Sequence, residues 1–134
     1  MKVFLDVNIV MYAAGGPHPH KIPSLTLLEQ VSNGQIEAVS DAEVLQELLY
    51  RYWHVKLLEQ GALLVEHTVR LVPTILPVVI ADLLLAGSLL REYRHLEPRD
   101  AVHAAIMLNH GLTHLYSYDR HFDAIPGLTR LEPK

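Results

Sequence analysis

The sequence predicts an α/β domain built on a mainly parallel sheet of four to five strands, with helices on both faces. Short apolar runs alternate with helix-like segments along the chain, and parallel neighbouring strands need such helical crossovers. Acidic residues follow closely after two of the predicted strands. Because 134 residues is a usual size for one domain, we expect a single domain spanning residues 1–134.

The first predicted strand covers residues 2–5 and is followed at once by Asp6. A lone buried carboxylate is costly, so we expect Asp6 at the carboxyl end of this strand rather than inside it. Ligand clefts of open α/β sheets form at that edge. Residues 7–14 predict a short helix that stops at the Gly-Gly-Pro of residues 15–17. Capping of this helix is the alternative role for Asp6.

Residues 24–40 predict the next helix and strand. Ser24 is expected to cap a helix whose apolar residues recur at helical spacing, until Asn33 and Gly34 provide a stop. Residues 35–40 alternate polar with apolar side chains, which is typical of a strand. This strand should run parallel to the first, because a helix separates the two.

A long helix is predicted from a capping box of Ser40 and Glu43 to Gln60 and Gly61. Glu47 lies one turn into this helix at the edge of the apolar stripe, so we expect it near the strand ends. An exposed helix position is the alternative for Glu47. The predicted core stripe consists of Val44, Leu45, Leu48, Leu49 and Tyr52.

The middle of the chain predicts a helix over residues 62–70, a short strand over 74–78 and a helix over 81–94. The apolar stretch 71–90 is about as long as a membrane span requires. Two prolines four residues apart and Asp82 near its middle favour the strand and buried helix instead. We therefore expect no membrane association.

The clearest helix covers residues 97–111, with a proline in its first turn and a glycine at its end. Asp100 lies in the first turn, where the helix macrodipole favours an anion. Residues 112–117 predict a fourth strand, which Asp119 follows. Residues 128–131 predict a fifth strand at the sheet edge.

Four acids thus have comparable positions at one edge of the predicted sheet: Asp6, Glu47, Asp100 and Asp119. Crowded carboxylates repel one another unless a cation lies between them, so the cluster predicts a divalent metal site. Oxygen ligands favour Mg²⁺ or Mn²⁺, and the absence of cysteine excludes thiolate ligands. A metal-activated water at such a site suits phosphodiester hydrolysis.

Several other side chains have predicted supporting roles. Asn8 could orient Asp6, and Ser117 could do the same for Asp119. Asp123 is either a fifth, outer acid or an exposed residue of a short helix. The cations that could steer RNA towards the acids are Arg51 and Lys56, although such residues more often belong to a solvated helix face.

Composition limits the classes of function. The net charge of −4 argues against a protein that grips nucleic acid mainly through a broad basic surface. Half of the residues are apolar, which predicts that a partner or a second copy covers part of the surface. The lack of cysteine and of an extended apolar segment at the start predicts a cytoplasmic protein without an export signal.

Residues 4–8, Glu47 in its Val-Leu-Gln-Glu-Leu run, residues 99–105 and residues 117–123 resemble the successive acidic motifs of PIN-domain ribonucleases. The resemblance covers nearly the whole chain and is greatest to the toxins of VapBC-type toxin–antitoxin modules. It implies a PIN-like three-layer fold, Mg²⁺- or Mn²⁺-dependent cleavage of RNA, a homodimer and inhibition by a cognate antitoxin protein. It also implies that the four acids named above bind the metal. Val7 replaces the threonine that family members often have there, which removes a hydroxyl but no acid.

Two other functions fit parts of the pattern. Phosphatases that form an aspartyl-phosphate need a second aspartate two residues after the first, and Asn8 cannot donate the required proton. A non-catalytic PIN-like module that binds RNA or a partner would normally lack one or more of the acids. The histidines lack the spacing of zinc hydrolases, so we expect His103 to be packed or hydrogen-bonded rather than a metal ligand.

Overall fold

The computed structural model describes residues 1–134 and is built on a five-stranded sheet in the order β3-β2-β1-β4-β5. Every neighbouring pair of strands is parallel, which confirms the predicted type of sheet. The central strand β1 pairs with β2 on one side and β4 on the other. The strands are β1 (Lys2–Leu5), β2 (Glu37–Asp41), β3 (Thr74–Leu76), β4 (His114–Tyr116) and β5 (Thr129–Leu131).

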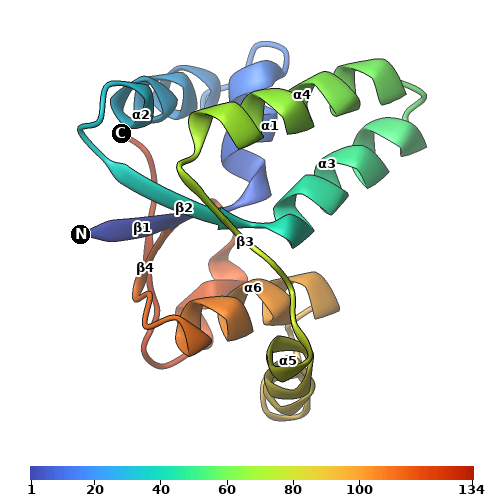
Figure 1. Ribbon diagram of the computed structural model, residues 1–134, viewed down its shortest axis with the longest axis vertical. Coiled ribbons are helices and arrows are strands. Elements are labelled where there is room, and N and C mark those ends of the chain that lie inside the picture. The colour runs from blue at the N-terminus through green and yellow to red at the C-terminus, as the bar shows by residue number, and fades with distance from the viewer.

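Helices cover both faces of the sheet, giving the predicted three layers (Figure 1). In the view of Figure 1, α1, α2 and α4 lie above the sheet, and α5 and α6 lie below it. The helices are α1 (Val7–Ala14), α2 (Lys21–Ser32), α3 (Ala42–His54), α4 (Leu58–Leu71), α5 (Ile80–Glu92) and α6 (Pro98–Asn109), followed by a short 3₁₀ helix, η1 (Arg120–Ala124).

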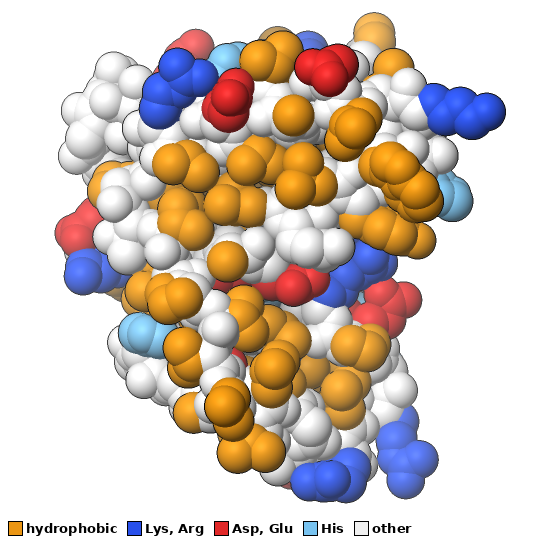
Figure 2. All heavy atoms as spheres, turned by 45° about the vertical axis from the view of Figure 1, so that its right-hand side comes forward, with side chains coloured by type: hydrophobic (Ala, Val, Ile, Leu, Met, Phe, Trp, Pro, Cys, Tyr) orange, Lys and Arg blue, Asp and Glu red, His pale blue; other side chains and the backbone are white.

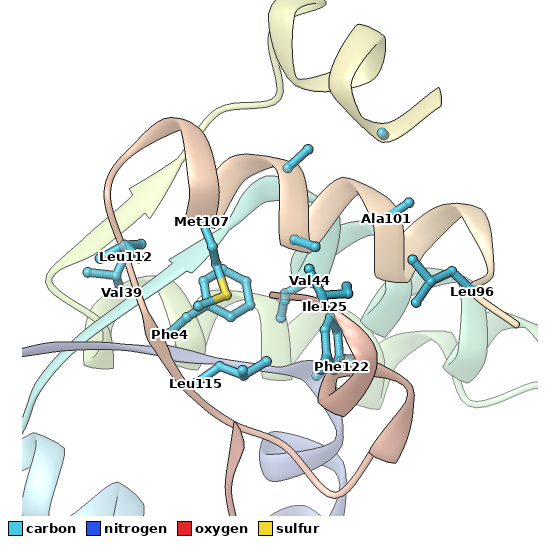
Figure 3. Close-up of a cluster of buried hydrophobic side chains, with 14 of the residues drawn as sticks. Phe4, Val39, Val44, Leu96, Ala101, Met107, Leu112, Leu115, Phe122 and Ile125 are labelled. Atoms are coloured by element: carbon cyan, nitrogen blue, oxygen red, sulfur yellow. The ribbon is translucent and has the colours of Figure 1, made fainter. Parts of the chain in front are cut away.

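The alternating side chains of β1 divide the core between the two faces. Leu5 packs in a smaller cluster with residues of α1 and α2, whereas Phe4 belongs to the larger cluster. Figure 3 shows Phe4, Met107 and Leu115 pointing towards one another between the sheet and α6. Because β1 is buried on both faces, the acid that follows it is held on a rigid support.

The predicted long helix from residue 41 to 60 is wrong. The chain reverses after α3 and begins α4 at Leu58, with Lys56 in a left-handed conformation at φ 63°. Gly61 is not a stop but lies inside α4, where a Cβ would come within 2.6 Å of Cβ of Tyr52. Glycine at this position therefore permits the close packing of α4 against α3. Of the predicted stripe, Leu45 is half-buried and Leu49 is exposed.

Two helix starts also differ from the prediction. Asp41, not Ser40, caps α3, because β2 continues through Asp41 in its pairing with β3. Oδ1 of Asp41 accepts a hydrogen bond from the Val44 amide at 2.9 Å, while the Ser40 hydroxyl donates to the Leu5 carbonyl at 3.0 Å. The second helix begins at Lys21, so Ser24 lies within its first turn and is buried.

The apolar stretch 71–90 divides into β3 and the start of α5, as predicted. Asp82 is buried there and caps α5 by accepting a hydrogen bond from the Val79 amide at 3.0 Å. None of the helices combines the length and the hydropathy that crossing a bilayer would require.

Candidate active site

The carboxyl ends of the five parallel strands meet at one edge of the sheet, and the acids gather there. Asp6 follows β1 directly, Asp41 ends β2 and Asp119 follows β4 by three residues. Helices α3 and α6 begin at the same edge, with Glu47 in the second turn of α3 and Asp100 in the first turn of α6. The strand order changes direction between β1 and β4, and clefts of α/β sheets form at such a switch point.

The first group of potential metal ligands consists of Asp6, Glu47 and His103, whose ligand atoms all lie within 4.8 Å of one another. All three residues are buried, with Asp6 and Glu47 each only 4% exposed. Nε2 of His103 lies 2.6 Å from Oε1 of Glu47 and 3.8 Å from Oδ1 of Asp6. The single imidazole thus lies between two carboxylates that come from different elements.

The surroundings of His103 favour its positively charged form. Its second nitrogen, Nδ1, lies 2.7 Å from Oδ2 of Asp41, so both ring nitrogens face carboxylate oxygens that can only accept. Burial lowers the pKa of His103, but the charge of Asp41 and the hydrogen bonds to Asp41 and Glu47 raise it well above its ordinary value. The imidazolium is therefore the counter-charge of the buried carboxylates.

Asp6 is both a helix cap and a member of this group. Its Oδ1 accepts a hydrogen bond from the Val7 amide at 2.8 Å, so the capping role and the site role are compatible. Burial raises the pKa of Asp6, and the nearby Glu47 charge adds to this effect, while His103 and Ser117 lower it. The raised pKa reflects how costly an uncompensated charge is at this position.

The second group consists of Asp100, Asp119 and His121, again with ligand atoms within 4.8 Å of one another. Nδ1 of His121 lies 3.2 Å from Oδ2 of Asp100 and 3.3 Å from Oδ1 of Asp119. Burial raises the pKa of Asp100, and the hydrogen bond from His121 opposes that rise. This group is more open than the first, because the side chain of His121 is 44% exposed.

Ser117 connects the two groups. Its hydroxyl donates to Oδ2 of Asp6 at 2.6 Å and accepts from the Asp119 amide at 2.9 Å. Asn8 lies beside them, and its Nδ2 is 3.3 Å from both Oδ2 of Asp6 and the Ser117 hydroxyl. Asn8 therefore contacts Asp6, the acid that it was predicted to orient. Ser117 was predicted to orient Asp119, but it binds the side chain of Asp6 and only the backbone of Asp119.

An open cleft of about 530 Å³ begins at Glu47, between α3 and the start of α6. Two arginines lie near the Glu47 carboxylate, and Arg99 also lines the cleft: Nε of Arg99 is 3.7 Å and Nη2 of Arg51 is 4.0 Å from Oε2. Figure 2 shows acidic side chains in a hollow between two surfaces rich in hydrophobic side chains. The residues that line the cleft are Glu43, Gln46, Glu47, Tyr50, Glu97, Pro98 and Arg99.

Two of the predicted supporting residues lie apart from the acids. Asp123 is outside both groups and pairs with Arg130 at 2.8 Å, which favours the exposed-residue alternative. Lys56 is exposed in the turn between α3 and α4 and makes no ion pair. Sequence reasoning missed Asp41 and His121 and assigned His103 no ligand position. Asp100 and His103 lie three residues apart on α6 but belong to different groups, so their spacing alone gives no signal for the partners of His103.

A family model and curated relatives both match nearly the whole chain. The family model described as "PIN domain" matches residues 3–128. Ribonuclease VapC13 of Mycobacterium tuberculosis is 40% identical over 129 residues, which cover 96% of this chain and 98% of that protein. Ribonuclease VapC23 of the same species is 34% identical over 120 residues, covering 87% of this chain and 92% of the relative.

Solved structures share the fold at lower identity. VapC20 of M. tuberculosis, described as a toxin that cleaves the sarcin–ricin loop, has a TM-score of 0.79 at 16% identity, with 98% of this chain and 99% of that chain covered. A VapBC2 complex of Rickettsia felis bound to promoter DNA has a TM-score of 0.77 at 20% identity, with both chains fully covered. The fold of this chain is therefore shared over nearly its full length with both solved structures.

Proposed function

This chain belongs to the PIN-domain family, and from that membership we propose that it is a metal-dependent endoribonuclease and the toxin of a toxin–antitoxin pair. The observation that carries the proposal is the gathering of buried acids at one sheet edge, with histidines as their counter-charge. The curated relatives that are 34–40% identical over most of their length are named ribonucleases, which supports the same activity.

The donor set fits a hard divalent cation. We assign metal binding to Asp6, Glu47, Asp100 and Asp119, because each of the two groups brings carboxylates together with only one histidine, His103 or His121, as a nearby cation. When bound there, Mg²⁺ or Mn²⁺ would activate water and neutralise the charge that develops on the phosphate.

The residues of the chain itself have three tasks in this proposal. Ser117 and Asn8 fix the orientation of the Asp6 carboxylate through their hydrogen bonds. Asp41 fixes the His103 ring, which in turn holds Glu47. Arg99 and Arg51 place positive charge beside Glu47, where it attracts the phosphates of the substrate.

The decisive experiment compares RNA cleavage by the wild-type protein and by Asp6→Asn and Glu47→Gln. We expect cleavage in Mg²⁺ or Mn²⁺, none in EDTA, and a loss of about 100-fold or more in either variant, because each removes charge from the acid group. Glu66→Gln, on an exposed position of α4, is the matched control and should retain full activity. RNA binding without metal-dependent cleavage would instead support the non-catalytic module.

We also propose a cytoplasmic homodimer that binds an antitoxin protein, and the surface supports both contacts. Figure 2 shows two exposed surfaces rich in hydrophobic side chains. Light scattering should give twice the mass of the chain, and Leu84→Glu, which places a charge on α5, should shift it towards the monomer. An unchanged mass would contradict the use of α5. The exposed apolar residues of α3 and α4 include Leu49, Trp53, Leu58, Leu63 and Val69, and those of α5 include Ile80, Leu83 and Leu84.

A further inference from the structure

Four aromatic rings pack together beside the acids: those of Tyr12, His18, His20 and Tyr118. His20 and Tyr118 are stacked, with ring centroids 3.7 Å apart and planes inclined by 12°. Tyr12 meets the Tyr118 ring edge-on at 5.3 Å and lies 4.5 Å from the ring of His18. The ring cluster is partly open to solvent, since His18 is exposed and the other three residues are half-buried.

The ring cluster is built on the same elements as the acid groups. Tyr118 lies between Ser117 and Asp119, and its backbone amide donates to Oδ1 of Asn8 at 3.3 Å. Tyr12 is four residues after Asn8 in α1, so the two share one face of the helix. A strand of nucleic acid whose phosphate reaches the acids would therefore have a neighbouring nucleotide within reach of the rings.

The segment that carries His18 and His20 is held in place by hydrogen bonds. The Lys21 ammonium donates to the carbonyls of Ala13 and Gly15 across the base of the segment. Nδ1 of His18 accepts the His20 amide at 3.0 Å, so in the neutral ring the proton is on Nε2. His18 thus presents an aromatic face and one fixed hydrogen-bond donor.

We propose that this ring cluster binds one unpaired base of a single-stranded RNA, next to the phosphodiester that is cut. The inference rests on the proposed ribonuclease function and adds the part of the substrate that the site recognises. Unpaired bases bind proteins by stacking on aromatic rings and by edge hydrogen bonds, and this surface offers both. Its rings have polar edges rather than aliphatic groups, which suits a base better than the apolar face of a partner helix.

The test uses a randomised single-stranded RNA pool and sequencing of the cut ends. Wild-type protein should show a base preference at one position beside the cut. His18→Ala and Tyr12→Leu should lower kcat/KM by about tenfold and flatten the preference at that position, since each removes a ring. Tyr12→Phe keeps the ring and should retain the preference. His67→Ala, an exposed histidine on α4, is the matched control and should behave as the wild type.

A substrate with an abasic nucleotide at the preferred position separates recognition from folding. The wild type, His18→Ala and Tyr12→Leu should cut it at equal rates, because no base is present to contact the rings. Equal losses on the abasic and the complete RNA would assign the rings to the fold alone and overturn the proposal. An unchanged base preference in His18→Ala and Tyr12→Leu would overturn it as well.

Failure of the ribonuclease function has a different result. If the wild type cuts no RNA in Mg²⁺ or Mn²⁺, binding of the same pool is measured instead, in EDTA. Weaker binding by His18→Ala and Tyr12→Leu than by the wild type and His67→Ala would still support a base site. Equal binding by all four proteins would reject it.

Discussion

His103 and Glu47 are separated by 56 residues in the sequence, yet Nε2 of His103 lies 2.6 Å from Oε1 of Glu47. The contact joins α6 to α3 across the sheet edge, and Asp41 holds the other side of the same ring at 2.7 Å. A buried imidazolium is thus surrounded by carboxylates from β2 and α3, with Asp6 nearby. The free energy of unfolding should therefore depend on the charge of His103 and of the carboxylates that it contacts.

Replacing His103 by asparagine should destabilise the metal-free protein. The change leaves Asp41 and Glu47 without their shared cation, and breaking a buried ion pair costs about 3–5 kcal/mol. Chemical unfolding in EDTA measures this loss. His67→Asn, at an exposed position on α4, should change the free energy of unfolding by less than about 0.5 kcal/mol. Equal stabilities of the two variants would contradict the proposed role of the imidazolium.

The stability of the metal-free protein should fall as the pH rises from near neutral. The pKa of His103 is raised well above its ordinary value in the folded protein, whereas in the unfolded chain it is about 6.5. A raised pKa stabilises the fold fully below the unfolded value, and this contribution disappears as the pH rises through the folded value. Urea unfolding in EDTA at several pH values measures the trend, and His103→Asn should lack this part of it.

Ser117→Ala should weaken the site without unfolding the protein. The change removes the hydroxyl that donates to Oδ2 of Asp6 at 2.6 Å, and groups that orient metal ligands typically contribute about tenfold or more to metal affinity or activity. Calorimetric titration with Mn²⁺ and RNA cleavage both measure the effect. Ser88→Ala, which removes an exposed hydroxyl on α5, is the control. Equal Mn²⁺ affinities of these variants would rule out an orienting role for Ser117.

Gly61→Ala should destabilise the protein by about 1–3 kcal/mol, because its Cβ would meet Cβ of Tyr52 at 2.6 Å and force α4 away from α3. Gly87→Ala is the matched change in α5, where a Cβ would meet nothing within 4 Å. That substitution should be neutral or stabilise by up to about 1 kcal/mol. Thermal unfolding separates the two outcomes, and equal melting temperatures would show that the α3–α4 contact yields easily.

Local patterns were sufficient to predict most of the fold. Alternating strands and helices predicted the parallel sheet, and the acids after β1 and β4 predicted which edge would be charged. The long helix predicted over residues 41–60 failed, because apolar spacing continues through the turn at Lys56 and does not show that the chain reverses there. The sequence predicts a stop at Gly61, because it does not show that this glycine packs against Tyr52 of a different helix.

The sequence by itself determined most of the strand and helix order, and it predicted one sheet edge for Asp6, Glu47, Asp100 and Asp119 because each lies close to a strand end or a helix start. Only the tertiary structure divided them into two groups, one around His103 and one around His121. It also showed that Asp41 caps α3 and contacts His103, although the sequence predicted neither role for it. The physical reason is that periodicity reports which face a residue occupies, whereas the pairing of buried charges depends on the packing of α3 against α6, which no local pattern encodes.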